Sequence, residues 1–206
     1  MNSTSGFIYN VLEWVTRFAY VNLLWILFTL LGGVLLGFYP ATLAMFAICR
    51  DWLRGDTGKP VFPMFWEYYR RDFVKSNLLG LFVTAIAAFI ALDIFYIQTS
   101  SETLSWTHIP LFAFMLLFTM YLFYLFPTFV HFDIKIGWVI KNAFLIMLIN
   151  PLNTLLIFVC LGSLAVIMQT IPALAVIFGG SSFSYIIMWL ALRSFSRMNK
   201  GGELQG

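Results

Sequence analysis

Four long stretches without a charged side chain dominate the pattern of this chain. Asp, Glu, Lys and Arg are absent from residues 18–49, 76–92, 103–132 and 142–192. About 20 apolar residues suffice for a helix to cross a bilayer, and backbone groups in lipid must be hydrogen-bonded within their own segment. Along the strands of a membrane barrel, apolar residues alternate with polar ones, and these stretches show no such alternation. The pattern therefore predicts an all-α protein, a polytopic integral membrane helical bundle.

The lengths of these stretches predict six spans, with five as an open alternative. The last stretch is long enough for two helices separated by a break at 169–172, and the first is too long for one untilted crossing. If 38–53 crosses the membrane, Gly37–Pro40 forms the turn before it; if 38–53 is re-entrant, five spans remain. We expect one transmembrane domain over 1–206, with spans at about 18–36, 38–53, 76–97, 108–130, 144–168 and 172–193.

The composition and charge of the chain are those of a protein that lies mostly in the membrane. Of 206 residues, 61% are hydrophobic and 10% are charged, against about 25% charged in soluble domains. Six Lys or Arg lie between Arg50 and Lys75, and others lie at Lys135, Lys141 and Arg193–Lys200. Because Lys and Arg favour the cytoplasmic side, alternation of these clusters predicts a cytoplasmic C-terminus. The net charge of +3 is small, so we expect no nucleic-acid partner.

Residues 62–75 predict an amphipathic helix in the cytoplasmic interface. Aromatic residues from Phe62 to Phe73 share one helical face, while Arg70, Arg71 and Lys75 lie on other faces. Such a helix lies in the headgroup plane, where it either caps the bundle against anionic lipid or offers a docking surface. The candidate docking residues are Arg50, Trp52, Arg54, Phe65, Trp66, Tyr69, Arg70, Arg71 and Lys75.

No catalytic or metal-binding motif is recognisable in the chain. It has no G-x-S-x-G, H-E-x-x-H or P-loop and no Cys/His cluster. We therefore expect no enzymatic activity, no catalytic residue, no cofactor and no metal. The predicted spans also lack ionised side chains, which pumps and ion-coupled carriers usually place there.

Polar residues inside the last apolar stretch form one further candidate site. Asn150, Asn153, Thr154 and Gln169 could line a polar notch where Pro151 kinks a helix. Hydrogen bonding between helices is the commoner role for such residues.

Several segments resemble the YesL-like family of small bacterial membrane proteins. They are NLLWILFTLLGGVLLGFYPATLAMFAICRDWLRG, PVFPMFWEYYRRDFVKSNLLG, YLFPTFV and IKNAFLIMLINPLNTLLI, and the resemblance covers nearly the whole chain. Its most specific part runs from Pro40-Ala41-Thr42 to Arg54, followed by the segment that ends Lys75-Ser76-Asn77. The resemblance implies a multi-pass protein of the bacterial cytoplasmic membrane that accompanies carbohydrate-uptake operons with ABC importers. It supplies no catalytic residues.

We therefore expect an accessory transmembrane subunit of an oligosaccharide ABC importer, which stabilises or regulates the permease. Its partners would be the permease subunits and membrane lipids, with the ATPase and the solute-binding protein contacted indirectly. The chain lacks the E-A-A-x-x-x-G coupling segment of a permease. Two alternatives stay open: a stand-alone carrier for a neutral sugar that uses the polar notch, and a membrane sensor that regulates carbohydrate utilisation through residues 50–75.

Overall fold

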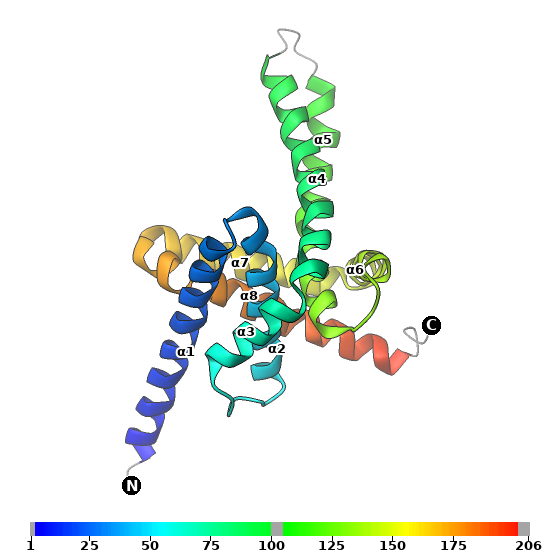
Figure 1. The fold of residues 1–206 in the computed structure, drawn as a ribbon. Coiled ribbons are helices and arrows are strands. Elements are labelled where there is room, and N and C mark those ends of the chain that lie inside the picture. Colours follow the sequence, from blue (N-terminus) through cyan, green and yellow to red (C-terminus); the bar gives the residue numbers. More distant parts are fainter. Residues whose placement is uncertain (1–2, 100–104, 202–206) are drawn as a thin grey trace.

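The computed structural model describes residues 3–99 and 105–201, which fold into helices joined by short connections (Figure 1). No β-strand occurs among these residues, so the predicted all-α class is confirmed. The helices are α1 (Ser3–Leu31), α2 (Leu35–Leu53), α3 (Val61–Arg71), α4 (Phe73–Thr99), α5 (Ser105–His131), α6 (Ile136–Ile149), α7 (Pro151–Thr170) and α8 (Pro172–Gly201).

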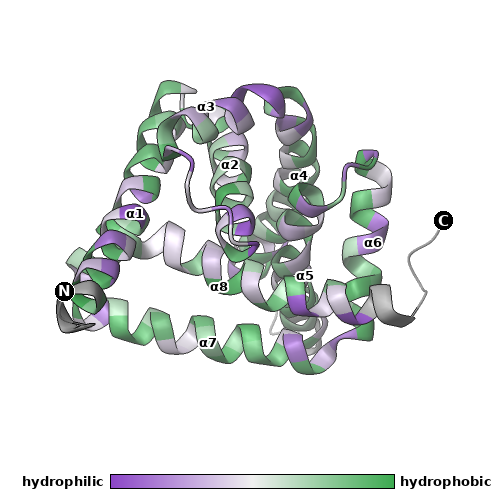
Figure 2. Cartoon of the chain, turned by 90° about the horizontal axis from the view of Figure 1, so that it is seen from below, coloured by the Kyte–Doolittle hydropathy of each residue, from purple (hydrophilic) through white to green (hydrophobic). Residues whose placement is uncertain are grey.

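Five of the helices are long and apolar enough to cross a membrane. The segments are Phe7–Leu31, Phe73–Thr99, Ile109–His131, Pro151–Thr170 and Pro172–Arg197. Helices α4 and α5 rise together away from the rest, while α7 and α8 run across their direction (Figures 1 and 2). The five apolar helices support a multi-pass membrane protein, but they do not all share one axis. Six spans are not confirmed, because α2 is not among the five.

Helix α2 is the central element of the fold. It contacts α1, α3, α4, α5 and α8, and every residue from Pro40 to Cys49 is buried. Ala41, Ala44 and Ala47 keep this helix slim, which allows close packing on several sides. The predicted segment 38–53 therefore lies in a helix that is covered by protein on most of its surface.

The turn between α1 and α2 lies earlier than predicted. It is formed by Gly32, Gly33 and Val34, with left-handed φ angles of 70° at Gly33 and 64° at Val34. Glycine adopts such a φ without strain, whereas a β-branched valine rarely does. The expected turn at Gly37–Pro40 is wrong, because both residues lie inside α2. The predicted span 18–36 accordingly ends at Leu31.

Helix α1 also begins earlier than the charge-free stretch suggested. It passes through Glu13 and Arg17, whose side chains form an ion pair at 2.6 Å one helical turn apart. The apolar helices of the structure are longer than the predicted spans and therefore include charged residues, here Glu13 and Arg17, and also Lys75 and Asp93 in α4 and Arg193 in α8. Mutual pairing of Glu13 and Arg17 lowers the free energy needed to place them in an apolar helix.

Two further predicted boundaries differ from the structure. The span 144–168 is wrong as a single helix, because the chain breaks at Asn150, where φ is −117° and ψ is 56°. Pro151 then opens α7, a position where its missing N–H costs no hydrogen bond. The helix predicted over 62–75 ends at Arg71, so Lys75 lies in α4. The predicted break before Pro172 is confirmed.

Candidate functional site

The predicted docking residues divide into a buried and an exposed group. Trp52, Phe65 and Tyr69 are buried, and the side chain of Arg50 is only 14% exposed. These four hold α2 and α3 in the fold and have little surface left for a partner. The exposed members are Arg54, Trp66, Arg70, Arg71 and Lys75.

An aromatic cluster fixes α3 against α1. The ring of Phe28 lies 5.2 Å from Phe65, 5.7 Å from Trp66 and 5.0 Å from Tyr69, between ring centroids. These are the tilted contacts that aromatic pairs favour. The cluster uses the buried face of α3 and leaves Phe62 and Trp66 each nearly half exposed. Figure 2 shows the hydrophilic residues of this region gathered on α3 and at its ends.

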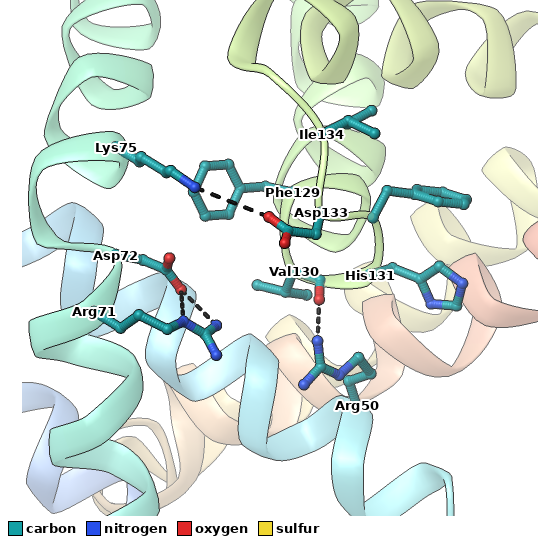
Figure 3. Close-up of a pocket in the computed structure, with 10 residues that line it drawn as sticks. Arg50, Arg71, Asp72, Lys75, Phe129, Val130, His131, Asp133 and Ile134 are labelled. Carbon is teal, nitrogen blue, oxygen red and sulfur yellow. Dashed lines mark hydrogen bonds and ion pairs between the residues drawn. The ribbon is translucent and has the colours of Figure 1, made fainter. Parts of the chain in front are cut away.

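Arg50 joins three helices at one point. Its Nε and Nη2 donate to Asp51 Oδ1 at 2.9 and 2.7 Å, and its Nη1 donates to the carbonyl of Val130 at the end of α5 (Figure 3). The Tyr68 hydroxyl of α3 donates to the other oxygen of Asp51. A guanidinium at a helix C-terminus binds carbonyls that have no partner in the helix and complements the dipole. The Arg50–Asp51–Tyr68 network therefore links α2, α3 and α5.

The pKa of Tyr68 reflects its place in this network. Burial, together with the hydrogen bond to the Asp51 carboxylate, raises the pKa of Tyr68 to about 12. Both effects favour the neutral phenol, which must keep its proton in order to donate to Asp51. The Tyr68 hydroxyl therefore keeps its proton throughout the physiological pH range.

A cavity of about 300 Å³ adjoins this network, and we call it the α3–α5 groove (Figure 3). Arg50, Arg71 and Lys75 line it together with Asp72 and Asp133. Arg71 binds Asp72 at 2.7 Å, and Lys75 lies 3.9 Å from Asp133. Because each exposed cation here faces a carboxylate, the groove offers little net charge to a ligand.

A second cavity, the α5–α8 groove, shares His131 and Phe132 with the first. Its volume is about 480 Å³, and Arg54, Ser196 and Phe195 also line it. The Arg54 guanidinium lies 3.2 Å from Nδ1 of His131. Sequence reasoning singled out Arg54 but not His131 or Ser196, since each stands alone in its own segment.

The predicted polar notch is closed by hydrogen bonds. Asn150, Asn153 and Thr154 are buried, and Asn153 Nδ2 donates to Ser194 Oγ of α8 at 2.7 Å. Thr154 Oγ1 donates to the hydroxyl of Tyr124 at 3.1 Å. Gln169 is exposed at the far end of α7. Asn153 and Thr154 thus join α7 to α8 and α5, whereas the Asn150 amide donates to the Ile146 carbonyl of α6. Gln169 does not belong with them.

Replacing Asn153 by alanine should therefore weaken the fold moderately. The change removes the bond to Ser194, and interhelical hydrogen bonds in membrane proteins contribute about 0.6 to 1.7 kcal/mol. We expect a loss of about 1 kcal/mol in the free energy of unfolding, measured in mixed detergent micelles. Gln169→Ala is the control and should leave stability unchanged; an equal loss in both variants would contradict the assignment.

Metal chemistry has no visible support in residues 3–99 and 105–201. Within these residues no three His, Cys, Asp or Glu side chains lie close enough to hold an ion. Cys49 and Cys160 are both free thiols.

Comparison with known proteins places the chain in a family. The family described as "Protein of unknown function, DUF624" matches residues 18–94, which run from the middle of α1 through α2 and α3 into α4. YesV and YteU of Bacillus subtilis (strain 168) are each 36% identical, over 90% and 94% of this chain and 89% and 87% of their own lengths. YesL of the same organism is 36% identical over 92% of this chain and 90% of its own. All three are described as uncharacterized proteins.

No solved structure matches the fold. The matched region 18–94 contains the central helix α2 and the Arg50–Asp51–Tyr68 network. Because YesV, YteU and YesL are each 36% identical over at least 90% of this chain, the protein belongs to the same family as these three proteins, and its residues 18–94 match the DUF624 family model.

Proposed function

We propose that the chain is an accessory transmembrane subunit of a bacterial ABC importer for oligosaccharides, which stabilises or regulates the permease. The importer and its oligosaccharide are what the resemblance to the YesL-like family implies, and the observation that favours an accessory subunit over a carrier is the filled centre of the fold. A carrier needs a polar path through its middle, but here α2 occupies that place with ten successive buried residues, 40–49. A protein without such a path is better suited to bind and support a permease than to carry the sugar itself.

The outer surface suits such a companion. Large apolar side chains are exposed on several helices, among them Leu23 of α1, Leu81 of α4 and Leu152 of α7. Exposed apolar faces of this kind are satisfied by lipid or by the helices of a neighbouring membrane protein. Arg54, Trp66 and Arg70 add exposed polar and aromatic groups, which in the proposed topology lie near the membrane surface.

Co-purification tests this proposal directly. The tagged chain should bring down the permease from mild detergent in the presence of the transported oligosaccharide. Trp66→Ala combined with Arg70→Gln should reduce the recovered permease about tenfold, the size of effect expected for an aromatic and arginine anchor. Lys59→Gln is the control, since Lys59 is exposed but pairs only with Asp56 of its own loop.

Two outcomes would contradict the accessory role. One is recovery of the tagged chain alone while the importer itself stays assembled. The other is sugar flux into proteoliposomes that contain only this chain, which would support a stand-alone carrier. Loss of regulation in an Arg70/Arg71 variant with normal assembly would instead support a sensor.

We also propose that α2 spans the membrane inside the protein, which keeps the count at six and the C-terminus in the cytoplasm. The helix has 19 residues, about 28 Å of rise, which is close to the thickness of the hydrocarbon core. Its C-terminal end bonds the end of α5 through Arg50 and Val130. The ends of α2 and α5 therefore share one side, where the abundance of Lys and Arg favours the cytoplasm.

Cysteine labelling from the two sides of the membrane distinguishes six spans from five. Leu35→Cys lies at the start of α2 and Lys59→Cys lies in the loop after it. In a background without Cys49 and Cys160, a membrane-impermeant maleimide should label Leu35→Cys only from outside and Lys59→Cys only from inside. Labelling of both from one side would show that α2 is re-entrant.

A further inference from the structure

The α5–α8 groove is lined by both apolar and polar residues. Leu53, Phe132, Leu192 and Phe195 form its apolar lining. Arg54, His131 and Ser196 supply the polar atoms. At about 480 Å³, the volume lies within the range of small-ligand sites. The groove therefore has the amphiphilic character that suits a ligand with a polar head and an apolar body.

The charge among the residues that line this groove is positive. Arg54 is exposed, and its guanidinium lies 3.2 Å from Nδ1 of His131. None of the residues that line the groove is Asp or Glu. In the neighbouring α3–α5 groove, by contrast, Arg71 and Lys75 face Asp72 and Asp133. Of these two grooves, the α5–α8 groove is the one that can attract an anion.

The polar groups are held in position by packing. The His131 ring lies 4.6 Å from the Phe132 ring and 4.7 Å from the Phe195 ring, between centroids. Ser196 is exposed, and its hydroxyl donates to the Leu192 carbonyl at 2.9 Å. The hydroxyl oxygen keeps lone pairs and can rotate its hydrogen towards a better acceptor. Arg54, directly after α2, and Ser196 of α8 thus approach the groove from two different parts of the chain.

The groove lies where two apolar helices end. The candidate spans Ile109–His131 and Pro172–Arg197 both terminate at residues beside it. The ends of transmembrane helices lie at the level of the lipid headgroups. In the proposed topology, in which α5 crosses the membrane and ends at His131, a ligand that places a phosphate at Arg54 has its apolar part towards the acyl chains.

We propose that the α5–α8 groove binds the headgroup of an anionic phospholipid. The phosphate accepts hydrogen bonds from Arg54 and Ser196, and the apolar lining contacts the glycerol and the upper acyl chain. Arginine favours phosphate because its planar group donates two parallel hydrogen bonds. This inference does not depend on the importer, since it rests only on the groove and the helix ends.

Lipid retention by the purified full-length protein tests the proposal. The protein would be exchanged into detergent with phosphatidylcholine and increasing phosphatidylglycerol, and bound lipids would be counted by native mass spectrometry. We expect one phosphatidylglycerol to be retained at concentrations where phosphatidylcholine is not. Arg54→Gln should weaken this retention about tenfold, as expected for one charge-assisted contact.

Two further variants separate the groove from a general effect of charge. Lys75→Gln removes an exposed cation from the neighbouring groove and should leave retention unchanged. Ser196→Trp keeps every charge but fills the groove, and it should abolish retention. Thermal unfolding of each lipid-free variant identifies any that has merely lost its fold, and Arg54→Gln, at an exposed position, is expected to keep it.

Three results would overturn the assignment. Equal retention by Arg54→Gln and the unchanged protein would exclude Arg54 as the phosphate ligand. Equal binding of phosphatidylcholine would mean that the groove does not recognise headgroup charge. Displacement of the lipid by millimolar inorganic phosphate would make the site one for a free anion rather than for a lipid.

Discussion

Replacing Arg50 by alanine is expected to lower the free energy of unfolding by about 3–5 kcal/mol, the range for breaking a buried ion pair. The side chains of Arg50 and Asp51 are only 14% and 11% exposed. Without the guanidinium, the Asp51 carboxylate keeps a hydrogen bond from Tyr68 but loses its counter-charge. The Val130 carbonyl at the end of α5 loses its donor as well. The measurement is equilibrium unfolding in mixed detergent micelles.

The matched control for Arg50 is Arg71, which also pairs with the aspartate that follows it. The Arg71–Asp72 ion pair has the same N–O distance of 2.7 Å, but the Arg71 side chain is 56% exposed. Water and salt screen such a pair, so Arg71→Ala should change stability by less than about 1 kcal/mol. Similar losses in both variants would refute the view that burial makes Arg50 essential to the fold.

The difference between Arg50 and Arg71 marks what the sequence could not predict. Both arginines lie in a basic segment next to an aspartate, and local spacing assigned both to a docking surface. Only the path of α5 places a helix C-terminus against Arg50, and that path depends on contacts between residues about 80 positions apart. Burial depends on tertiary packing, and neither clusters of charge nor aromatic periodicity in the sequence predicts that packing.

The helices themselves were largely predictable, because long apolar stretches without charge form helices in a membrane. Breaks were harder to predict. Asn150–Pro151 was recognised as a kink but ends a helix, since Asn150 leaves the helical region of φ and ψ. Pro40 was expected near a turn, yet α2 runs through it, while Gly32–Gly33 turns the chain. A proline close to a helix start is compatible with either outcome, so the sequence alone did not decide.

The contact between α1 and α2 depends on glycine at position 37. A Cβ at Gly37 would lie 2.5 Å from the carbonyl oxygen of Thr29 and 2.6 Å from that of Phe28. Both neighbours are backbone atoms of α1, which cannot move aside as the end of a flexible side chain could. A Cβ at Gly32 would likewise lie 2.3 Å from the Cα of Gly37. The two helices therefore touch through their backbones at this level.

Gly37→Ala is accordingly expected to destabilise the protein by about 3 kcal/mol, the upper part of the usual range for overpacking. Separation of α1 from α2 would loosen the central helix, so limited proteolysis should also cut the turn at Val34 faster. Gly162→Ala in α7 is the control, because nothing lies within 4 Å of its added Cβ. In that open helical position alanine should be neutral or stabilise by up to about 1 kcal/mol. If Gly37→Ala is as stable as Gly162→Ala, α1 and α2 are not in backbone contact, and the close packing of the central helix is refuted.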